Sequence, residues 1–448
     1  MIKFLKPGVV VAIMHYILNT LLLTVLMIMP LMTAFAASAT ASKEPQTTYP
    51  RLTYATTEPQ YDFSEIAALI GDHAGTEEND LYTGASVLIA HQGKIFYQQA
   101  FGYAQVSELQ SNGQLLRSEN PIPVSSETIF DLASVTKVAA TTVSLMHLVS
   151  EQQLFLDDTL DKFFAEFSGT DKAKISVRQL LTHRSGLWQW QPTWLYTTNN
   201  RTTVDYIAAL PLRYSPGERR AYSDLGFILL GKIIEKVSGM PLNQFTERHI
   251  YNPLGMNNTG YRPVPAKGKQ IAATSHGNPF EQNMVATGKP YPLAQPLPKE
   301  PFSAYRNYTL IGEANDGNAW YGLGGVAGHA GLFSTVGDLA ILGQTLLNGC
   351  GYGNFRLCDA DTLNTFLQTP YDNHQALGFW KDNNATGVSF WHPGFTGTQF
   401  LVQPEQQLVI VLLTNRQHGG LNRDNGRYPD LSPVWKKLVK LTSQLVSE

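Results

Sequence analysis

The stretch Ser134-Val135-Thr136-Lys137 opens an apolar-rich segment, Thr136–Ser150, that we expect to be helical. In a helix, Ser134 and Lys137 are three residues apart and share a face, so the amine can reach the hydroxyl. A serine hydroxyl becomes a good nucleophile when a base takes its proton, and burial lowers a lysine pKa toward the neutral form that a base needs. The helix N-terminus would also lend the N–H of Ser134 to an oxyanion. This spacing alone occurs by chance, but it is the only S-x-x-K in the chain.

A second motif, Tyr222-Ser223-Asp224, supplies a phenol and a carboxylate two residues apart, which an extended segment turns to the same side. Tyr222 can relay the proton of Ser134 to a leaving group when a cation lies nearby, because an unperturbed tyrosine has a pKa of about 10. Asp224 would then hold the Lys137 ammonium. The plain alternative is a core tyrosine before a helix cap formed by Ser223 or Asp224, and both roles can hold together.

A third motif begins at His392 and lies just before a strand pattern. Pro393 lacks an N–H and suits a strand that borders a cleft. Gly394 allows a close backbone approach, and the N–H of Phe395 would be the second oxyanion donor. We expect His392 to orient Tyr222 or a substrate carboxylate, although a lone histidine more often makes a structural hydrogen bond. Together the three motifs predict a serine acyl-transfer site without a histidine base.

Two other histidines, His183 and His329, lie in glycine-containing turns, and we interpret both as structural hydrogen-bonding residues. Cys350 and Cys358 are the only cysteines, and an exported chain favours a local disulfide between them. They cannot complete a tetrahedral metal shell without further ligands, so we expect no metal site and no cofactor.

Length and composition limit the class of protein. The chain has 448 residues, and this length predicts one large two-lobed unit or two domains. Hydrophobic residues make up 43% of the chain, which is enough for a sizeable core. Its formal net charge is −3 and no basic block resembles a nucleic-acid footprint, so we expect no nucleic-acid partner.

The N-terminus carries an export signal. Lys3 and Lys6 precede a mostly apolar run, Val9–Met32, and small residues suited to a signal peptidase follow it. We therefore expect residues 1–39 to be a cleaved signal peptide or a retained membrane anchor, residues 40–59 a linker, and residues 60–448 the domain. Both alternatives place the domain on the periplasmic side of the inner membrane.

The remaining pattern predicts an α+β fold. Strands are expected near both chain ends, at Ser86–Ala90, Ile95–Ala104, Val388–Phe390, Thr398–Val402 and Leu408–Leu413. Helices are expected to dominate between Ser134 and about Asn348, including Leu225–Val237, and the tail Val434–Val446 is also helical. The five prolines between Lys289 and Pro301 predict a long loop. An antiparallel sheet from the two termini, flanked by helices and with a helical lobe inserted, would bring all three motifs to one seam.

These motifs resemble the serine β-lactamase and penicillin-recognising superfamily, on the branch of class C β-lactamases and D-Ala-D-Ala carboxypeptidases. The matching stretches are Phe130–Lys137, Leu180–Leu187, Tyr222–Asp224, His392–Thr398 and Thr414–Arg416. Ile271–Thr274 and Gly324–Thr335 resemble more narrowly the penicillin-binding protein 4B branch. The resemblance covers about residues 60–448. It implies a mixed α/β lobe and an all-α lobe, with Ser134 acylated and with Lys137 and Tyr222 as proton carriers.

The resemblance also leaves open which substrate is used. The second motif commonly ends in Asn where this chain has Asp224, and Pro393 lacks the hydroxyl that helps to bind a substrate carboxylate. We expect an exported D-Ala-D-Ala carboxypeptidase that acts on peptidoglycan stem peptides and binds β-lactams. The alternatives are an esterase or weak class C-like β-lactamase acting on a small acyl substrate, and a catalytically quiet binding protein.

Overall fold

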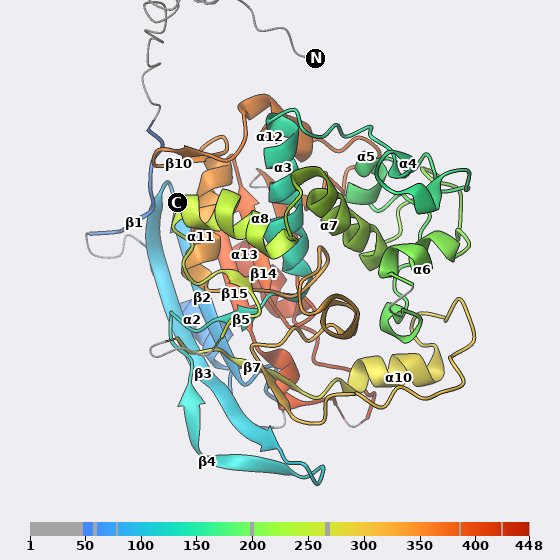
Figure 1. Ribbon diagram of the computed structural model, residues 1–448. Helices are drawn as coiled ribbons and strands as arrows, with labels where there is room; N and C mark the ends of the chain where they lie inside the picture. The colour runs from blue at the N-terminus through green and yellow to red at the C-terminus, as the bar shows by residue number, and fades with distance from the viewer. Residues whose placement is uncertain are drawn as a thin grey trace, which may run out of the picture. The chain divides into compact units, whose positions relative to one another are not determined.

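A sheet built from both ends of the chain, antiparallel except where β1 joins it, organises the molecule (Figure 1). The computed structural model describes residues 48–56, 61–77, 79–197, 201–264, 269–384, 387–422 and 424–447. The predicted signal peptide or anchor, residues 1–39, lies outside these ranges, as does part of the predicted linker. Within them, no helix is both long and apolar enough to cross a bilayer.

The described residues form an eight-stranded sheet in the order β1-β3-β2-β15-β14-β13-β12, with β4 paired to β3. Its strands are β1 (Thr53–Tyr54), β2 (Gly84–His91), β3 (Lys94–Leu109), β4 (Leu115–Pro123), β12 (Trp380–Asn384), β13 (Gly387–Pro393), β14 (Gln399–Gln403) and β15 (Leu408–Thr414). Smaller sheets contain β5 (Phe130–Asp131), β6 (Gly260–Tyr261) and β9 (Leu332–Ser334), then β7 (Ala273–His276) with β8 (Thr309–Ile311), and β10 (Gly351–Tyr352) with β11 (Phe355–Arg356). The predicted strands Ser86–Ala90 and Ile95–Ala104 are confirmed within β2 and β3, which pair antiparallel as a hairpin. Part of the predicted linker also pairs with the sheet, as β1 parallel to β3.

The central strands are buried on both faces. Leu88 of β2 pairs with Val411 of β15 on the face toward the helical lobe, whereas Ile89 pairs with Ile410 on the opposite face. That opposite face packs against α2 (Ser64–Gly71) and α13 (Ser432–Leu445). Burial on both faces explains why β15 reads as a continuous apolar run and not as an alternating one.

Helices fill the middle of the chain, as the pattern predicts (Figure 1). The α-helices are α3 (Val143–Ser150), α4 (Leu160–Phe163), α5 (Val177–Leu181), α6 (Thr203–Ala209), α7 (Asp224–Ser238), α8 (Leu242–Thr246), α9 (Asn252–Leu254), α10 (Pro279–Thr287), α11 (Val336–Leu347) and α12 (Ala360–Leu367). Short 3-10 or π turns are η1 (Ala133–Val135), η2 (Lys137–Thr142), η3 (Ala165–Phe167), η4 (Thr193–Leu195), η5 (Glu247–Tyr251), η6 (Asn318–Gly322) and η7 (Arg416–Gly419). The predicted helix 225–237 is confirmed as α7, which ends at Gly239 in the left-handed region with φ 68°. The proline-rich stretch after Lys289 contains no helix or strand, as expected.

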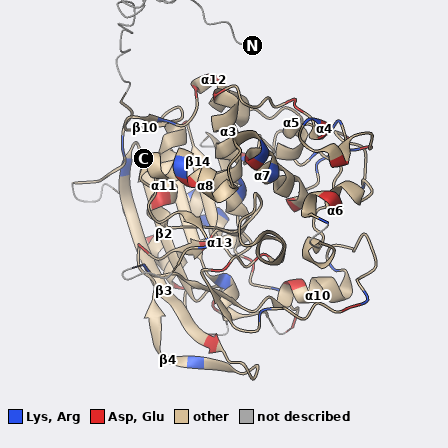
Figure 2. Ribbon diagram, in the orientation of Figure 1, with Lys and Arg blue, Asp and Glu red and all other residues tan. Residues whose placement is uncertain are grey.

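Charged residues of both signs are interspersed along the ribbon in the view of Figure 2. Buried ionisable side chains are few by comparison, and Lys137 is among them with no exposed surface. A buried charge is costly unless it is paired, so the elements that supply partners for Lys137 must pack together around it.

The disulfide between Cys350 and Cys358 closes the loop that carries β10 and β11. In the chain-entropy picture so short a loop contributes about 2–3 kcal/mol to the free energy of unfolding. We predict that the double variant Cys350→Ser/Cys358→Ser lowers that free energy by about this amount, measured as a lower urea midpoint under oxidising conditions. The same midpoint for the wild type and the variant would contradict the prediction, and wild type treated with reductant serves as the matched control.

Candidate active site

Ser134 and Lys137 lie where the sheet meets the helical lobe. Ser134 is in η1, and Lys137 opens η2, the π-helical turn that continues into α3. The Lys137 ammonium donates to Ser134 Oγ at 3.1 Å, the contact that the three-residue spacing predicts. Ser134 is partly exposed while Lys137 is fully buried, so the serine can be reached from solvent and the amine cannot.

Three oxygens surround the Lys137 ammonium. Besides Ser134 Oγ, it donates to the His329 carbonyl oxygen at 2.9 Å and forms an ion pair with Asp224 Oδ1 at 2.7 Å. Its Nζ also lies 4.9 Å from the centre of the Tyr222 ring. These groups come from η1, the start of α7 and the loop before β9, so the charge joins segments that are far apart in the sequence.

The protonation of Lys137 differs from the expectation. Burial lowers the pKa of Lys137, but the Asp224 carboxylate and the Tyr222 phenol raise it by more, and the net direction is upward. The prediction of a lysine made neutral by burial is therefore wrong for the free enzyme. A carboxylate at ion-pair distance stabilises the ammonium more than the apolar surroundings disfavour it. Lys137 is consequently a cation at neutral pH.

Tyr222 completes the group around the serine. Burial raises the pKa of Tyr222 to about 12, in spite of the nearby Lys137 ammonium and the interactions of the phenol with Lys137 and Ser134, which lower it. Its ring packs on His183, with 4.6 Å between ring centres. Ser223 accepts from the N–H of Gly226 as the N-cap of α7. The motif therefore caps the helix with Ser223 and also places Tyr222 and Asp224 beside Lys137.

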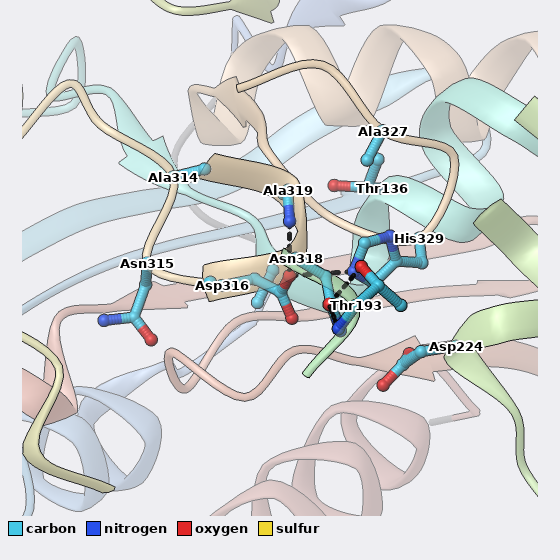
Figure 3. Close-up of polar contacts among 12 residues, drawn as sticks. Thr136, Thr193, Asp224, Ala314, Asn315, Asp316, Asn318, Ala319, Ala327 and His329 are labelled. Atoms are coloured by element: carbon cyan, nitrogen blue, oxygen red, sulfur yellow. Dashed lines mark hydrogen bonds and ion pairs between the residues drawn. The ribbon is translucent and has the colours of Figure 1, made fainter. Parts of the chain in front are cut away.

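His183 and His329 both hold backbone in place, as their sequence context suggests. His183 Nδ1 accepts from the N–H of Ser223 at 3.0 Å, which fixes the residue beside Tyr222. His329 Nε2 contacts Asp316 Oδ1 at 2.8 Å, and Figure 3 shows the two side chains pointing toward one another. This contact holds the turn whose carbonyl binds Lys137.

His392 lies at the end of β13 and is buried, with its ring 6.1 Å from that of Tyr222. Its Nδ1 lies 2.8 Å from the Pro393 carbonyl oxygen, which can only accept, so Nδ1 carries the proton and Nε2 is left as an acceptor. Burial and the Lys137 charge lower the pKa of His392 to about 3. The ring is therefore neutral and offers a hydrogen-bond acceptor rather than a positive charge.

The backbone after His392 is tied directly to the turn that carries Ser134. Thr396 Oγ1 donates to the Asp131 carbonyl at 2.6 Å, and Thr398 Oγ1 donates to the Leu132 carbonyl at 2.9 Å. A Cβ on Gly394 would overlap the same Leu132 oxygen, so only glycine allows this approach. These contacts hold the stretch after His392 against the turn before Ser134, and the oxyanion role of the Ser134 and Phe395 N–H groups stays a prediction.

Asp131 is a positioning residue that the sequence analysis missed. Its two carboxylate oxygens accept from the N–H groups of Ala133 at 2.8 Å and Asn315 at 2.7 Å. Ala133 has φ 44°, a left-handed conformation that costs an L-residue about 1–2 kcal/mol. The carboxylate offsets that strain directly before Ser134. The adjacent buried strand pair β5–β9 contains Asp131, but nothing in its local sequence distinguishes it from an ordinary polar residue.

A second network, of hydrogen bonds beside the turn that carries His329, was also missed by the sequence analysis. Asp316 accepts from the N–H of Ala319 at 2.7 Å as well as contacting His329 (Figure 3). Asn318 Oδ1 accepts from both the N–H and the hydroxyl of Thr193. The network thus joins η4, η6 and the loop before β9. Its only signal in the sequence was the glycine-rich stretch around His329.

Among the described residues, no cluster of three or more His, Cys, Asp or Glu side chains has the geometry to hold a metal ion. The chemistry that the observed contacts can supply is nucleophilic attack by a hydroxyl and proton transfer through an amine and a phenol.

Comparison with known proteins identifies the family of the chain. A model of the family described as Beta-lactamase matches residues 74–431. A protein of Escherichia coli K12 named "Putative D-alanyl-D-alanine carboxypeptidase" is 34% identical over 363 residues, which are 75% of this chain and 79% of that protein. A protein of the same name from Salmonella agona is 34% identical over 366 residues, with the same two shares.

Solved structures with low sequence identity share the fold. A penicillin-binding protein homologue from Caulobacter crescentus has a TM-score of 0.60 at 18% identity, and the match covers 85% of this chain and 97% of that chain. EstCE1, described as a hydrolase with promiscuous acyltransferase activity, has a TM-score of 0.56 at 21% identity, covering 86% and 97%. The narrower penicillin-binding protein 4B branch stays a prediction. The family match over most of the chain and the relatives at 34% identity show that this chain belongs to the Beta-lactamase family and is a serine hydrolase with a mixed α+β fold.

Proposed function

We propose that the protein is an exported D-Ala-D-Ala carboxypeptidase that forms an acyl-enzyme at Ser134 and acts on peptidoglycan stem peptides. The observation that carries the proposal is the contact of Ser134 Oγ with the Lys137 ammonium, beside the Tyr222 hydroxyl. The names of the relatives at 34% identity support the choice of substrate. The lysines and apolar run before residue 40 support export.

In the proposed reaction Ser134 Oγ attacks the carbonyl carbon of the penultimate D-alanine. The oxyanion forms between the N–H groups of Ser134 and Phe395. The serine proton passes through Tyr222 and Lys137 to the nitrogen of the terminal D-alanine, the C–N bond breaks, and D-alanine leaves with that proton. Water then attacks the ester, loses its proton to the same pair, and frees the serine.

The Lys137–Tyr222 pair must give up one proton before it can accept the serine proton. The ammonium has a raised pKa, and the Tyr222 pKa is about 12, so the proton-poor pair becomes more abundant as pH rises. Asp224 Oδ1 lies 2.7 Å from the Lys137 ammonium and helps to raise its pKa. Asp224 therefore sets the pH at which the acylation rate increases. His392 would accept a hydrogen bond from Tyr222 or from a substrate N–H at its neutral Nε2.

An esterase is the second candidate, and one observation favours it. Pro393 offers no hydroxyl and His392 carries no charge, so the third motif has little to bind the carboxylate of a terminal D-alanine. EstCE1 shares the fold. Turnover of a D-Ala-D-Ala peptide, a p-nitrophenyl ester and a cephalosporin separates these activities, and turnover of the ester alone would replace the first proposal with the second.

We predict that a fluorescent penicillin labels wild-type protein covalently and does not label Ser134→Ala, because the variant has no hydroxyl to acylate. Labelling is measured by gel fluorescence and intact mass. Ser144→Ala is the matched control, since Ser144 is a buried helical serine of α3 whose hydroxyl bonds to the Ala140 carbonyl away from the site. Equal labelling of wild type and Ser134→Ala would overturn the acyl-enzyme, and no labelling of either would support a quiet binding protein. Intact mass also reads whether residues 1–39 are cleaved.

We predict that Asp224→Asn shifts the rising limb of the acylation-rate profile to lower pH by about one unit or more. The variant removes the carboxylate that raises the Lys137 pKa, so the proton-poor pair forms at lower pH. The measurement is the rate of penicillin acylation between pH 5 and about 10 by stopped flow. Asp224→Glu keeps the charge and should keep the limb near its wild-type position. A limb that moves to higher pH in Asp224→Asn would show that Lys137 is not part of the proton path.

A further inference from the structure

Glu281 is a buried acid of α10 that the proposed reaction does not use. It lies outside the three motifs and is only 8% exposed. Its Oε2 accepts from the N–H of Gly317 at 2.8 Å and from the side-chain amide of Asn278, the N-cap of α10. The same amide of Asn278 donates to the Asn315 carbonyl at 2.7 Å. The start of α10 is therefore bonded at two points to one short stretch, which we call the 315–317 segment.

On one side the 315–317 segment is bonded to the turn that carries the nucleophile. The N–H of Asn315 donates to Asp131 Oδ2 at 2.7 Å. The other oxygen of that carboxylate accepts from the N–H of Ala133, directly before Ser134, at 2.8 Å. One carboxylate therefore links the segment to the backbone of the nucleophile, and a shift of the segment would displace Ser134.

On the other side the segment is bonded to the residue whose carbonyl binds the amine. Asp316 Oδ1 lies 2.8 Å from His329 Nε2, and the His329 carbonyl oxygen accepts from Lys137 at 2.9 Å. Figure 3 shows Asn315 and Asp316 next to each other on one loop, with the Asp316 side chain turned toward His329. Two adjacent residues thus lead to the hydroxyl and to the amine of the catalytic pair.

The contact between α10 and the 315–317 segment is sterically close. A Cβ at Gly317 would lie 2.5 Å from Glu281 Oε2 and 3.0 Å from the ring of Trp194. Phe280, the preceding residue of α10, packs against Phe395 of the third motif, with 5.2 Å between the ring centres. The first turn of α10 is therefore fixed against two parts of the site, and Glu281 is the side chain that reaches the 315–317 segment.

Glu281 holds its proton more tightly than an ordinary carboxyl. Burial raises its pKa well above the usual range, and the charge of Asp316 raises it further. The N–H of Gly317 and the Arg306 guanidinium act in the opposite direction but do not reverse the shift. The other ionisable side chains that interact with it are Asp224, Tyr305 and Tyr428. A protonated carboxyl can be replaced by a carboxamide, which has the same shape and keeps an acceptor oxygen.

We propose that Glu281 is a positioning residue for acyl transfer, which acts through the 315–317 segment to hold Ser134 and Lys137 in place relative to each other. Glu281 itself contacts neither of these two side chains. Its loss would free the segment, displace the serine and withdraw the His329 carbonyl from the ammonium. This inference rests on the Ser134 acyl-enzyme of the proposed function but does not depend on the D-Ala-D-Ala substrate.

The test follows acylation over time with a fluorescent penicillin and with p-nitrophenyl acetate, so that the rate constant and the final extent are measured separately. For Glu281→Ala we expect the rate constant to fall about tenfold or more, because small displacements of reacting groups are costly. The rising limb of its pH profile should move to lower pH, because the ammonium loses an acceptor that favours the charged form. Glu281→Gln keeps the acceptor oxygen and should acylate at the wild-type rate.

A second variant and a matched control separate positioning from stability. Glu281→Asp keeps the acid but withdraws it from Gly317 by one methylene, and it should also acylate slowly, so it decides the question if Glu281→Ala does not fold. Asp338→Ala is the control, because Asp338 is a buried acid of α11, 7% exposed, that accepts from Asn258 and Thr259. Lost stability alone should lower its final extent of acylation and leave its rate constant and pH limb unchanged.

Three results would overturn the positioning role. They are a wild-type rate constant in folded Glu281→Ala or Glu281→Asp, a change in the final extent alone, and a rate as slow in Glu281→Gln as in Glu281→Asp. Failure of the wild type to release D-alanine from a D-Ala-D-Ala peptide would remove the proposed substrate only, since acylation by the ester still measures the effect of Glu281. If neither probe acylates the wild type, both proposals are wrong.

Discussion

The structure depends on one buried positive charge. Lys137 has no exposed surface, and an unpaired ammonium in such a position would be costly. Its partners are the Asp224 carboxylate, the Ser134 hydroxyl and the His329 carbonyl. These come from the first turn after β5, from the start of α7 and from the loop before β9, so none of the three segments can move without leaving the charge unsatisfied. The charge thus fixes the nucleophile and holds the helical lobe to the sheet.

The backbone around this charge is held just as firmly. Asp131 stabilises the left-handed Ala133 directly before the nucleophile, and the hydroxyls of Thr396 and Thr398 connect the third motif to the same turn. An oxyanion hole works only if its two N–H groups are in place before the reaction starts. The hydrogen bonds between these two stretches would supply that preorganisation for the oxyanion donors proposed at Ser134 and Phe395.

The sequence predicts the fold and the central site residues well, because both depend on local patterns. Spacing alone placed Ser134 beside Lys137, and the extended start of α7 placed Asp224 near the same amine. The predicted direction of the Lys137 pKa shift was wrong. Burial and a carboxylate act in opposite directions, and the sequence does not give the distance between Lys137 and Asp224 that decides which effect is larger. Asp131 and the His329 carbonyl were missed for a different reason. The Asp131 carboxylate accepts from backbone N–H groups, and His329 binds Lys137 through its own carbonyl oxygen. Neither contact leaves a side-chain pattern in the sequence.

The two departures from the common motifs have a shared electrostatic consequence. Asp224 in place of Asn balances the Lys137 charge, and Pro393 beside a neutral His392 adds neither charge nor hydroxyl, so the centre of the site has little net attraction for an anion. Arg220, Lys436 and Lys440 are the cations that line a cavity beside Tyr222. Exposed charges act mainly on orientation and encounter, so the balance of charge at Lys137 and Asp224, and not these cations, bears on the acyl transfer itself.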